Sequence, residues 1–249
     1  MIHDSRTIAH AIALIALATA TTAVAGSFSI SPIRVELSAR QRTEALTVRN
    51  EEAGRAVVVQ AQAFEWSQQG GKDQLTETHD LIVTPPVFTL AGNAQQIVRV
   101  ASRRAADAKR ELTYRLILQE VPPAAPKTFT GLQVALRLSL PIFIGPSTKA
   151  SPELNWTAAW QPDGSLQVAA QNLGDMHAQV IDFTVQAENS SATMKNSVVK
   201  YVLPGATGSW TLQPPADAQQ LNTLKQGPLT LRGVSDRGDI STDLNASGQ

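Results

Sequence analysis

A short segment near the middle of the chain alternates strictly between large apolar side chains and other side chains. Residues 132–140 read Leu-Gln-Val-Ala-Leu-Arg-Leu-Ser-Leu, so that Leu132, Val134, Leu136, Leu138 and Leu140 share one face of an extended strand. A strand with one apolar face needs an apolar surface to cover it. Two interpretations fit this pattern: a core strand of a β-sandwich, or a strand whose side chains are lent to another protein.

The first 25 residues have the pattern of a secretory signal peptide. Arg6 precedes an apolar stretch over residues 8–20, and Ala23-Val24-Ala25 provides the small-x-small pattern of a cleavage site. The stretch is too short and too rich in alanine and threonine for a good membrane anchor, and no later segment is long and apolar enough to span a bilayer. We expect residues 1–25 to be removed and the mature protein to be exported without inserting into a membrane.

The charge balance and the lack of cysteine narrow the possible functions. The 249 residues include 21 basic and 21 acidic side chains and no cysteine. A balanced chain has no electrostatic footprint for nucleic acid. An exported chain without disulfides must rely on a sizeable hydrophobic core.

The remaining sequence predicts an all-β protein with two immunoglobulin-like sandwich domains. Short β-rich segments are separated by Pro- and Gly-containing turns at a spacing of about 8 to 12 residues, which is typical of such sandwiches. Residues 103–111 alone tolerate a helix, and we expect a loop or a single turn there. The turn-rich run from Pro146 to Pro152 is the best linker, so we place the domains at 26–145 and 146–249.

The first strand contains a change of face. Phe28 and Ile30 lie on one parity, whereas Ile33, Val35 and Leu37 lie on the other, with Pro32 between the two sets. A slip of one residue moves side chains to the opposite face of a sheet. We therefore predict a kinked strand that leaves one sheet and joins the other.

A search for catalytic or metal-binding motifs finds none, so we predict no enzyme activity, no metal and no cofactor. After the signal peptide only His79 and His177 remain, far apart in the sequence. We interpret His177 as a strand-edge histidine after a turn and the run Asp236-Arg237-Gly238-Asp239 as a solvated turn. The four tryptophans lie at strand positions, which favours core packing over a sugar-binding platform.

Several segments, in this order and spacing, resemble the PapD-like periplasmic chaperones of the chaperone–usher pilus pathway. The resemblance runs from about residue 27 to 238 and is strongest in the first domain. It rests on Ser31-Pro32-Ile33-Arg34-Val35, Val48-Arg49-Asn50, Val83-Thr84-Pro85-Pro86-Val87-Phe88, Gln96-Ile97-Val98-Arg99-Val100, Tyr114-Arg115-Leu116, Glu120-Val121-Pro122-Pro123, the 132–140 strand and Asn172-Leu173-Gly174-Asp175-Met176-His177-Ala178.

This resemblance implies two sandwich domains arranged like a boomerang in a periplasmic protein. It also implies that the 132–140 strand completes fimbrial subunits by donor-strand complementation, before their delivery to an outer-membrane usher. Leu132, Val134 and Leu136 are the expected main donors, with Leu138 joining them. An unused donor strand is an exposed edge, so we also expect weak self-association through it.

The resemblance further implies an anchor for the C-terminal carboxylate of the subunit, and here the sequence departs from the family pattern. The best-known members use an Arg on the first strand, matched by Arg34, and a Lys near the end of the donor strand. That Lys position falls on Pro141, which carries no charge. The run Leu140-Pro141-Ile142-Phe143 looks more like the archaic or alternative branch. Arg99 is the second candidate for the anchor.

Two other classes of function remain open from the sequence. A structural fimbrial subunit or adhesin would also be immunoglobulin-like, but it needs a free donor arm at its mature N-terminus, and residues 26–30 are too short for one. A secreted binding module for sugars would need exposed aromatic side chains.

Overall fold

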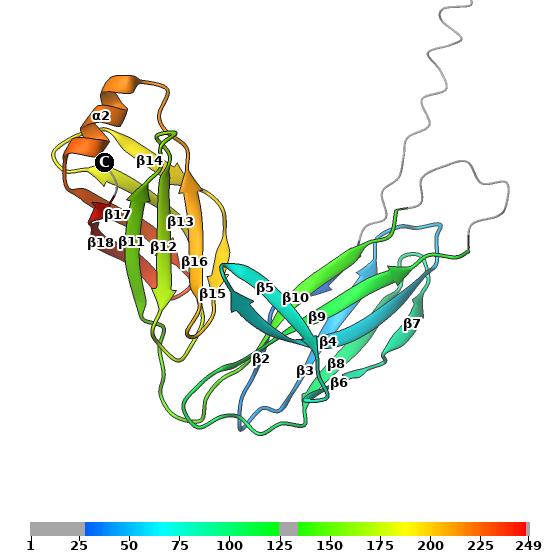
Figure 1. The fold of residues 1–249 in the computed structure, drawn as a ribbon. Coiled ribbons are helices and arrows are strands. Elements are labelled where there is room, and N and C mark those ends of the chain that lie inside the picture. Colours follow the sequence, from blue (N-terminus) through cyan, green and yellow to red (C-terminus); the bar gives the residue numbers. More distant parts are fainter. Residues whose placement is uncertain (1–27, 125–133, 248–249) are drawn as a thin grey trace, which may run out of the picture.

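The computed structural model describes residues 28–124 and 134–247, which form two β-sandwiches that meet at an angle (Figure 1). The predicted all-β architecture is therefore confirmed. No helix within the described ranges is long and apolar enough to cross a membrane. The predicted cleavage after Ala25 lies outside the described residues, and the domain limits at residues 145 and 146 stay a prediction.

The first sandwich contains strands β1 to β10 in two sheets. One sheet has the order β1-β3-β8-β6, and the other has the order β2-β10-β9-β4-β5 with β7 also paired to β4. The bounds are β1 Phe28–Ser31, β2 Val35–Leu37, β3 Thr43–Asn50, β4 Val57–Gln69, β5 Lys72–Glu77, β6 Leu81–Thr84, β7 Val87–Leu90, β8 Gln95–Ser102, β9 Leu112–Val121 and β10 Arg137–Ile144.

The second sandwich contains strands β11 to β19 and the helix α2. Its sheets have the orders β16-β12-β11-β19 and β14-β13-β17-β18, with β15 paired to β13. The bounds are β11 Leu154–Trp160, β12 Leu166–Asn172, β13 Ala178–Ala187, β14 Thr193–Asn196, β15 Lys200–Val202, β16 Thr207–Leu212, α2 Ala218–Gln226, β17 Leu229–Ser235, β18 Gly238–Leu244 and β19 Ala246–Ser247.

The tryptophans serve packing, as the sequence predicts. Trp160 and Trp210 are buried in the second core, and Trp156 stacks on Trp210 at 5.7 Å between ring centroids. Trp66 is buried where the two sandwiches meet. These positions leave no row of exposed tryptophan rings for sugars.

The predicted change of sheet in the first strand is confirmed. β1 pairs with β3 in one sheet, whereas β2 pairs with β10 in the other. Val35 and Leu37 are buried as expected. The prediction was wrong for Ile33, which is 74% exposed because it lies in the crossing segment before β2 begins.

Two further expectations need correction. The strand predicted at residues 132–140 lies further along the chain: β10 begins at Arg137 and ends at Ile144. The helix α2 was missed, although Asp217 caps it by accepting a hydrogen bond from the Gln219 N–H. Residues 103–111 form a loop, as predicted.

The two sandwiches are joined by a small apolar cluster of their own. Trp66 of β4 and Phe143 of β10 pack there with Leu203, Ala206 and Tyr201 from the second sandwich. Gln68 adds two hydrogen bonds of 3.0 Å, one donated to the Tyr201 carbonyl and one accepted from the Leu203 N–H. The C-terminal part of β10 is therefore part of the domain junction.

Candidate functional site at the open edge of β10 and the domain junction

Strand β10 has one edge that is only partly paired. It pairs with β9 over its whole length, but β2 covers only Ile142–Ile144 on the other edge. The Glu120 N–H donates to the Leu136 carbonyl at 2.8 Å, so even-numbered residues direct their backbone groups to β9. Odd-numbered residues therefore direct theirs to the opposite edge, where, among the described strands, nothing pairs with Arg137 or Ser139.

The apolar face of β10 emerges from the core toward its N-terminal end. Leu140 is buried, Leu138 is half-buried against the first core, Leu136 is half-buried and Val134 is 64% exposed. Leu132 lies outside the described residues. The side chains at the N-terminal end of this row are thus the ones available to a partner, and the role of all four as donors stays a prediction.

A buried carboxylate that is paired with a partly exposed arginine fixes the backbone where this segment leaves the sheet. Glu120 is 3% exposed, forms an ion pair with Arg55, and accepts a hydrogen bond from the Leu136 N–H at 3.3 Å. The carboxylate therefore pairs with a backbone donor at the last rung before the exposed residues, which limits fraying of Leu136.

Arg34 lies at the junction and already has two acidic partners. Its Nε is 2.9 Å from Oε1 of Glu36, and its Nη1 is 3.3 Å from Oδ2 of Asp236 in the second sandwich. The register Val35–Ile142 places Arg34 beside Pro141. A subunit carboxylate would have to compete with both acidic groups for this guanidinium.

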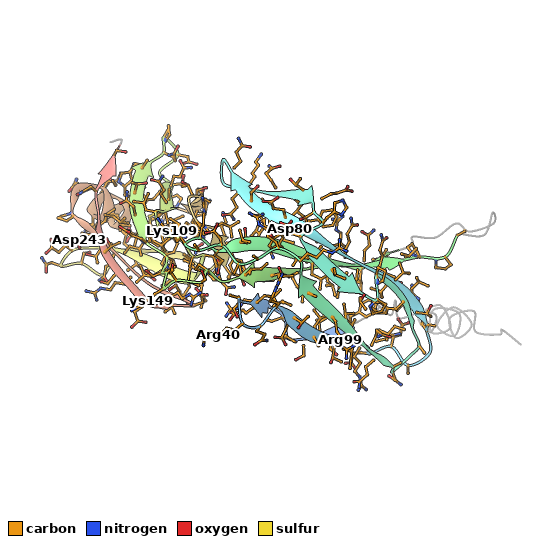
Figure 2. The ribbon with its side chains drawn as sticks, turned by 90° about the horizontal axis from the view of Figure 1, so that it is seen from below. Arg40, Asp80, Arg99, Lys109, Lys149 and Asp243 are labelled. Atoms are coloured by element: carbon orange, nitrogen blue, oxygen red, sulfur yellow. The ribbon has the colours of Figure 1, made fainter. Side chains whose placement is uncertain are left out.

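Arg99 is not brought to Arg34. It is exposed on β8, in the sheet opposite to β10, and Figure 2 shows it on the first sandwich, apart from the junction. Among the described residues, no hydrogen bond or ion pair joins its side chain to another residue. Its role as an anchor stays a prediction, without a second cation beside it.

A third arginine, which the sequence reasoning missed, faces a cavity between the two sandwiches. Arg115 lies opposite Pro141 on β9, and its guanidinium carbon is 3.6 Å from the Trp66 ring centroid. Its nearest acidic atom is Oδ2 of Asp73 at 3.8 Å. Burial lowers the pKa of Arg115. The cavity that it lines has a volume of about 520 Å³ and is also lined by Lys200 and Tyr201 of the second sandwich. The sequence did contain a hint of this role, because Arg115 occupies a position of a predicted strand that faces away from the core.

The junction contains a buried polar network that corrects two interpretations. His177 is buried, not merely at a strand edge: its Nδ1 is 2.7 Å from a Glu111 oxygen and its ring stacks on Phe143 at 3.6 Å. Asp236 lies in the predicted turn but is not solvated, because it accepts the Gln179 N–H and lies 3.5 Å from His177 Nε2. Burial lowers the pKa of His177, but the carboxylates of Asp236 and Glu111 beside the ring favour its charged form and outweigh burial, so the net pKa is raised. Each sandwich contributes charge to this network.

Comparison with known proteins identifies the family. The sequence pattern described as "Pili and flagellar-assembly chaperone, PapD N-terminal domain" matches residues 27–150. The archaic Csu chaperone–adhesin complex of Acinetobacter baumannii contains a similar fold, with a TM-score of 0.64 at 21% identity over 89% of this chain and 100% of that one. The chain belongs to the PapD-like family of pilus-assembly chaperones.

Two further PapD-like structures support the assignment of the fold. The SafB chaperone in complex with the SafA pilin of Salmonella enterica matches with a TM-score of 0.57 at 19% identity, covering 89% of this chain and 98% of that one. The CupB2 chaperone of Pseudomonas aeruginosa matches with a TM-score of 0.55 at 19% identity, covering 88% and 100%. No curated protein sequence matches the chain. The PapD-like family is a family of assembly chaperones and not of enzymes.

The PapD-like assignment argues against the structural-subunit alternative. The apolar row of β10 is internal and continues into the core of its own sandwich at Leu138 and Leu140. A complete second sandwich then follows it.

Among the described residues no group of three or more His, Cys, Asp or Glu side chains is placed to hold a metal ion.

Proposed function

We propose that this chain is a periplasmic chaperone that binds fimbrial subunits by donor-strand complementation. One observation carries the proposal: an apolar face runs out of the first core to Val134, on a strand whose outer edge, N-terminal to Pro141, has no partner strand among the described residues. A subunit strand that pairs with this edge would gain backbone hydrogen bonds, and its apolar groove would cover the donor side chains.

The donor side chains supply part of the binding free energy, in addition to the backbone hydrogen bonds along the edge. Each of Val134 and Leu136 contributes about 1.5–3 kcal/mol when fully buried, before the cost of ordering the segment. Leu138 contributes less, because it already packs against the first core. We therefore expect affinity to depend mostly on the more exposed donors.

The test is periplasmic co-expression with the fimbrial subunit encoded beside this chain. Wild type should yield a soluble complex, and a Val134→Asp/Leu136→Asp double variant should lose it while remaining folded alone. The matched control is Ile82→Asp/Ile97→Asp, because both residues are similarly exposed apolar strand positions in the opposite sheet. Equal recovery of subunit with all three proteins would reduce the 132–140 segment to a core strand and refute the proposal.

The anchor for a subunit carboxylate is proposed among three arginines. Arg34 lies beside the donor strand but is shared by Glu36 and Asp236. Arg115 has a single acidic neighbour at 3.8 Å and is already desolvated in the junction cavity, which strengthens an interaction with an incoming anion. We rank Arg115 and Arg34 above Arg99.

Subunits with a free or an amidated C-terminus distinguish these candidates. For the residue that binds the carboxylate, an Arg→Ala change should weaken binding of the free acid and leave binding of the amide unchanged. Arg103→Ala is the control, since Arg103 is exposed on a loop. If every single variant discriminates between acid and amide as wild type does, none of the three is the anchor.

Partners and location complete the proposal. The signal-like residues 1–25 support export to the periplasm, and N-terminal sequencing of the mature protein should begin at Gly26. The sequence at Pro141 and the likeness to the archaic Csu chaperone support the archaic or alternative branch.

Delivery to an outer-membrane usher is tested by capture on the usher: the chaperone–subunit complex should be retained, and the free chaperone should not. Weak self-association through the free edge is tested by sedimentation velocity.

A further inference from the structure

Pro141 lies at the boundary between the two halves of the outer edge of β10. On one side the parallel ladder with β2 covers Ile142–Ile144 and continues in a hydrogen bond of 2.9 Å from the Gly145 N–H to the Leu37 carbonyl. On the other side the edge is unpaired among the described residues. The residue type at the boundary therefore determines where one kind of pairing ends and the other begins.

The geometry of the ladder shows why the pairing stops there. Rungs of a parallel ladder repeat every two residues, so the rung from Gly145 to Leu37 is followed by one from Phe143 to Val35. The next would run from residue 141 to the Ile33 carbonyl. Proline has no N–H, and this rung cannot form. Ile33 lies in the segment that crosses to the other sheet, before β2 begins at Val35.

The proline does not disturb the other side of the strand. Pro141 is paired in register with Arg115 of β9, but its nitrogen faces away from β9, like those of the other odd-numbered residues. A proline is tolerated in a sheet at such an edge-facing position. The ladder to β9 therefore continues through Pro141 to Ile144, while the outer edge loses one donor.

We infer that Pro141 is a positioning residue that sets the register of the bound subunit strand. This inference rests on the proposed function. The subunit ladder can use the outward groups of Arg137 and Ser139 but cannot gain an N–H donor at residue 141. Without that N–H, β2 also cannot extend its ladder past residue 141 and so cannot compete with the subunit strand for the edge. Because neighbouring registers differ in which pocket receives Val134 and Leu136, a fixed end to the ladder selects one alignment of donors with pockets.

Disulfide scanning tests this inference directly, because the chain has no cysteine of its own. Cysteine is placed at the exposed Arg137 and, one position at a time, along the groove-edge strand of the subunit. With Pro141 present we expect cross-linking at one dominant position. Pro141→Ala, which restores the N–H, should spread cross-linking to the position two residues away.

A second variant moves the stop instead of removing it. Ser139→Pro also removes an outward-facing N–H at an exposed position, so the ladder to β9 stays intact. In a Pro141→Ala background it should restore one dominant cross-link, moved by two residues. In the free Pro141→Ala chaperone, amide exchange should show protection of the backbone N–H that the substitution introduces.

The outcomes separate this inference from the proposed function. A subunit that does not cross-link or bind to wild type at all refutes the function itself. A subunit that binds wild type, Pro141→Ala and Pro141→Ala/Ser139→Pro with the same cross-linking pattern refutes the register inference and leaves the function standing. Fast exchange of the N–H introduced by Pro141→Ala would also refute the claim that proline limits β2.

Discussion

Removal of the His177 ring should destabilise the protein more than any other single histidine change. The ring is 1% exposed and its Nδ1 is 2.7 Å from the Glu111 carboxylate, which is itself 2% exposed. Breaking a buried ion pair by removing one partner costs about 3–5 kcal/mol, because the other charge stays buried. Loss of the stack on Phe143 adds about 0.5–1.5 kcal/mol, part of which overlaps with the first term. We expect His177→Ala to lower the free energy of unfolding by about 3–5 kcal/mol.

The assay is equilibrium unfolding in guanidinium chloride, followed by tryptophan fluorescence. Trp66 packs near Phe143 in the same junction and reports on the separation of the two sandwiches. His79→Ala is the matched control, since His79 is exposed, and we expect a change within about 0.5 kcal/mol. Wild-type and variant slopes should be compared, because two domains need not unfold in one step.

A double-variant cycle with Glu111→Gln makes the reasoning refutable. The neutral amide removes the buried charge, so the His177→Ala/Glu111→Gln variant should lose less stability than the two single variants summed. The backbone N–H of His177 donates to the same Glu111 oxygen at 2.9 Å, and this bond survives the loss of the ring. A loss below about 1 kcal/mol for His177→Ala, or strictly additive effects, would show that the network contributes little.

Three further predictions concern pH, packing and the ion pair beside the donor segment. The raised pKa of His177 means that its contribution to stability is fully present below its unfolded pKa of about 6.5 and is lost as pH rises through its folded pKa. Unfolding free energies measured between about pH 6 and pH 9 should therefore fall with pH in wild type and fall less in His177→Ala. Leu140→Ala should cost about 2–5 kcal/mol because Leu140 is buried, whereas Val134→Ala should leave stability unchanged within about 0.5 kcal/mol and weaken subunit binding, as thermal melts and binding titrations can show. Glu120→Ala removes the side-chain acceptor of the Leu136 N–H and one of the two acidic partners of Arg55, and it should speed amide exchange at Leu136, whereas an exchange rate equal to that of wild type would contradict the proposed clamp.

Local patterns were sufficient where one neighbouring element determines the outcome. Alternation predicted which face of the 132–140 segment is apolar, and Leu138 and Leu140 do face the core. The change of parity across Pro32 predicted the crossing between sheets. The strand β4 buries alternate residues from Val57 to Ala63, as its pattern indicates.

Periodicity failed where a second surface covers the same strand. Residues 140–144 are buried on both faces, because Leu140, Ile142 and Ile144 face the first core while Phe143 packs at the domain junction. Alternation disappears under such conditions, so the C-terminal end of β10 could not be predicted from local sequence. The same contact explains His177 and Asp236, whose partners come from the other sandwich or from a distant strand.

The missed helix α2 is a different kind of failure, since its signals were local. Asp217 precedes the helix, Lys225 lies in its last turn and Gly227 follows it. Leu224 is its single buried residue, so the apolar stripe is too narrow to stand out against a sequence of strands. Capping residues were better guides here than hydrophobic pattern.

The way in which β10 is covered at its two ends also explains how the unbound protein can keep an unpaired strand edge without aggregating. Long, flat, apolar edges invite pairing with other copies, and natural sheets shorten or charge them. Here the exposed edge is short, since Pro141 and the junction close its C-terminal end and Glu120 fixes its last rung at Leu136. The exposed Arg137 places a charge on it. A short, charged edge of this kind gives a second copy of this chain few backbone partners, whereas a subunit that also covers Val134 gains apolar burial in addition to backbone hydrogen bonds.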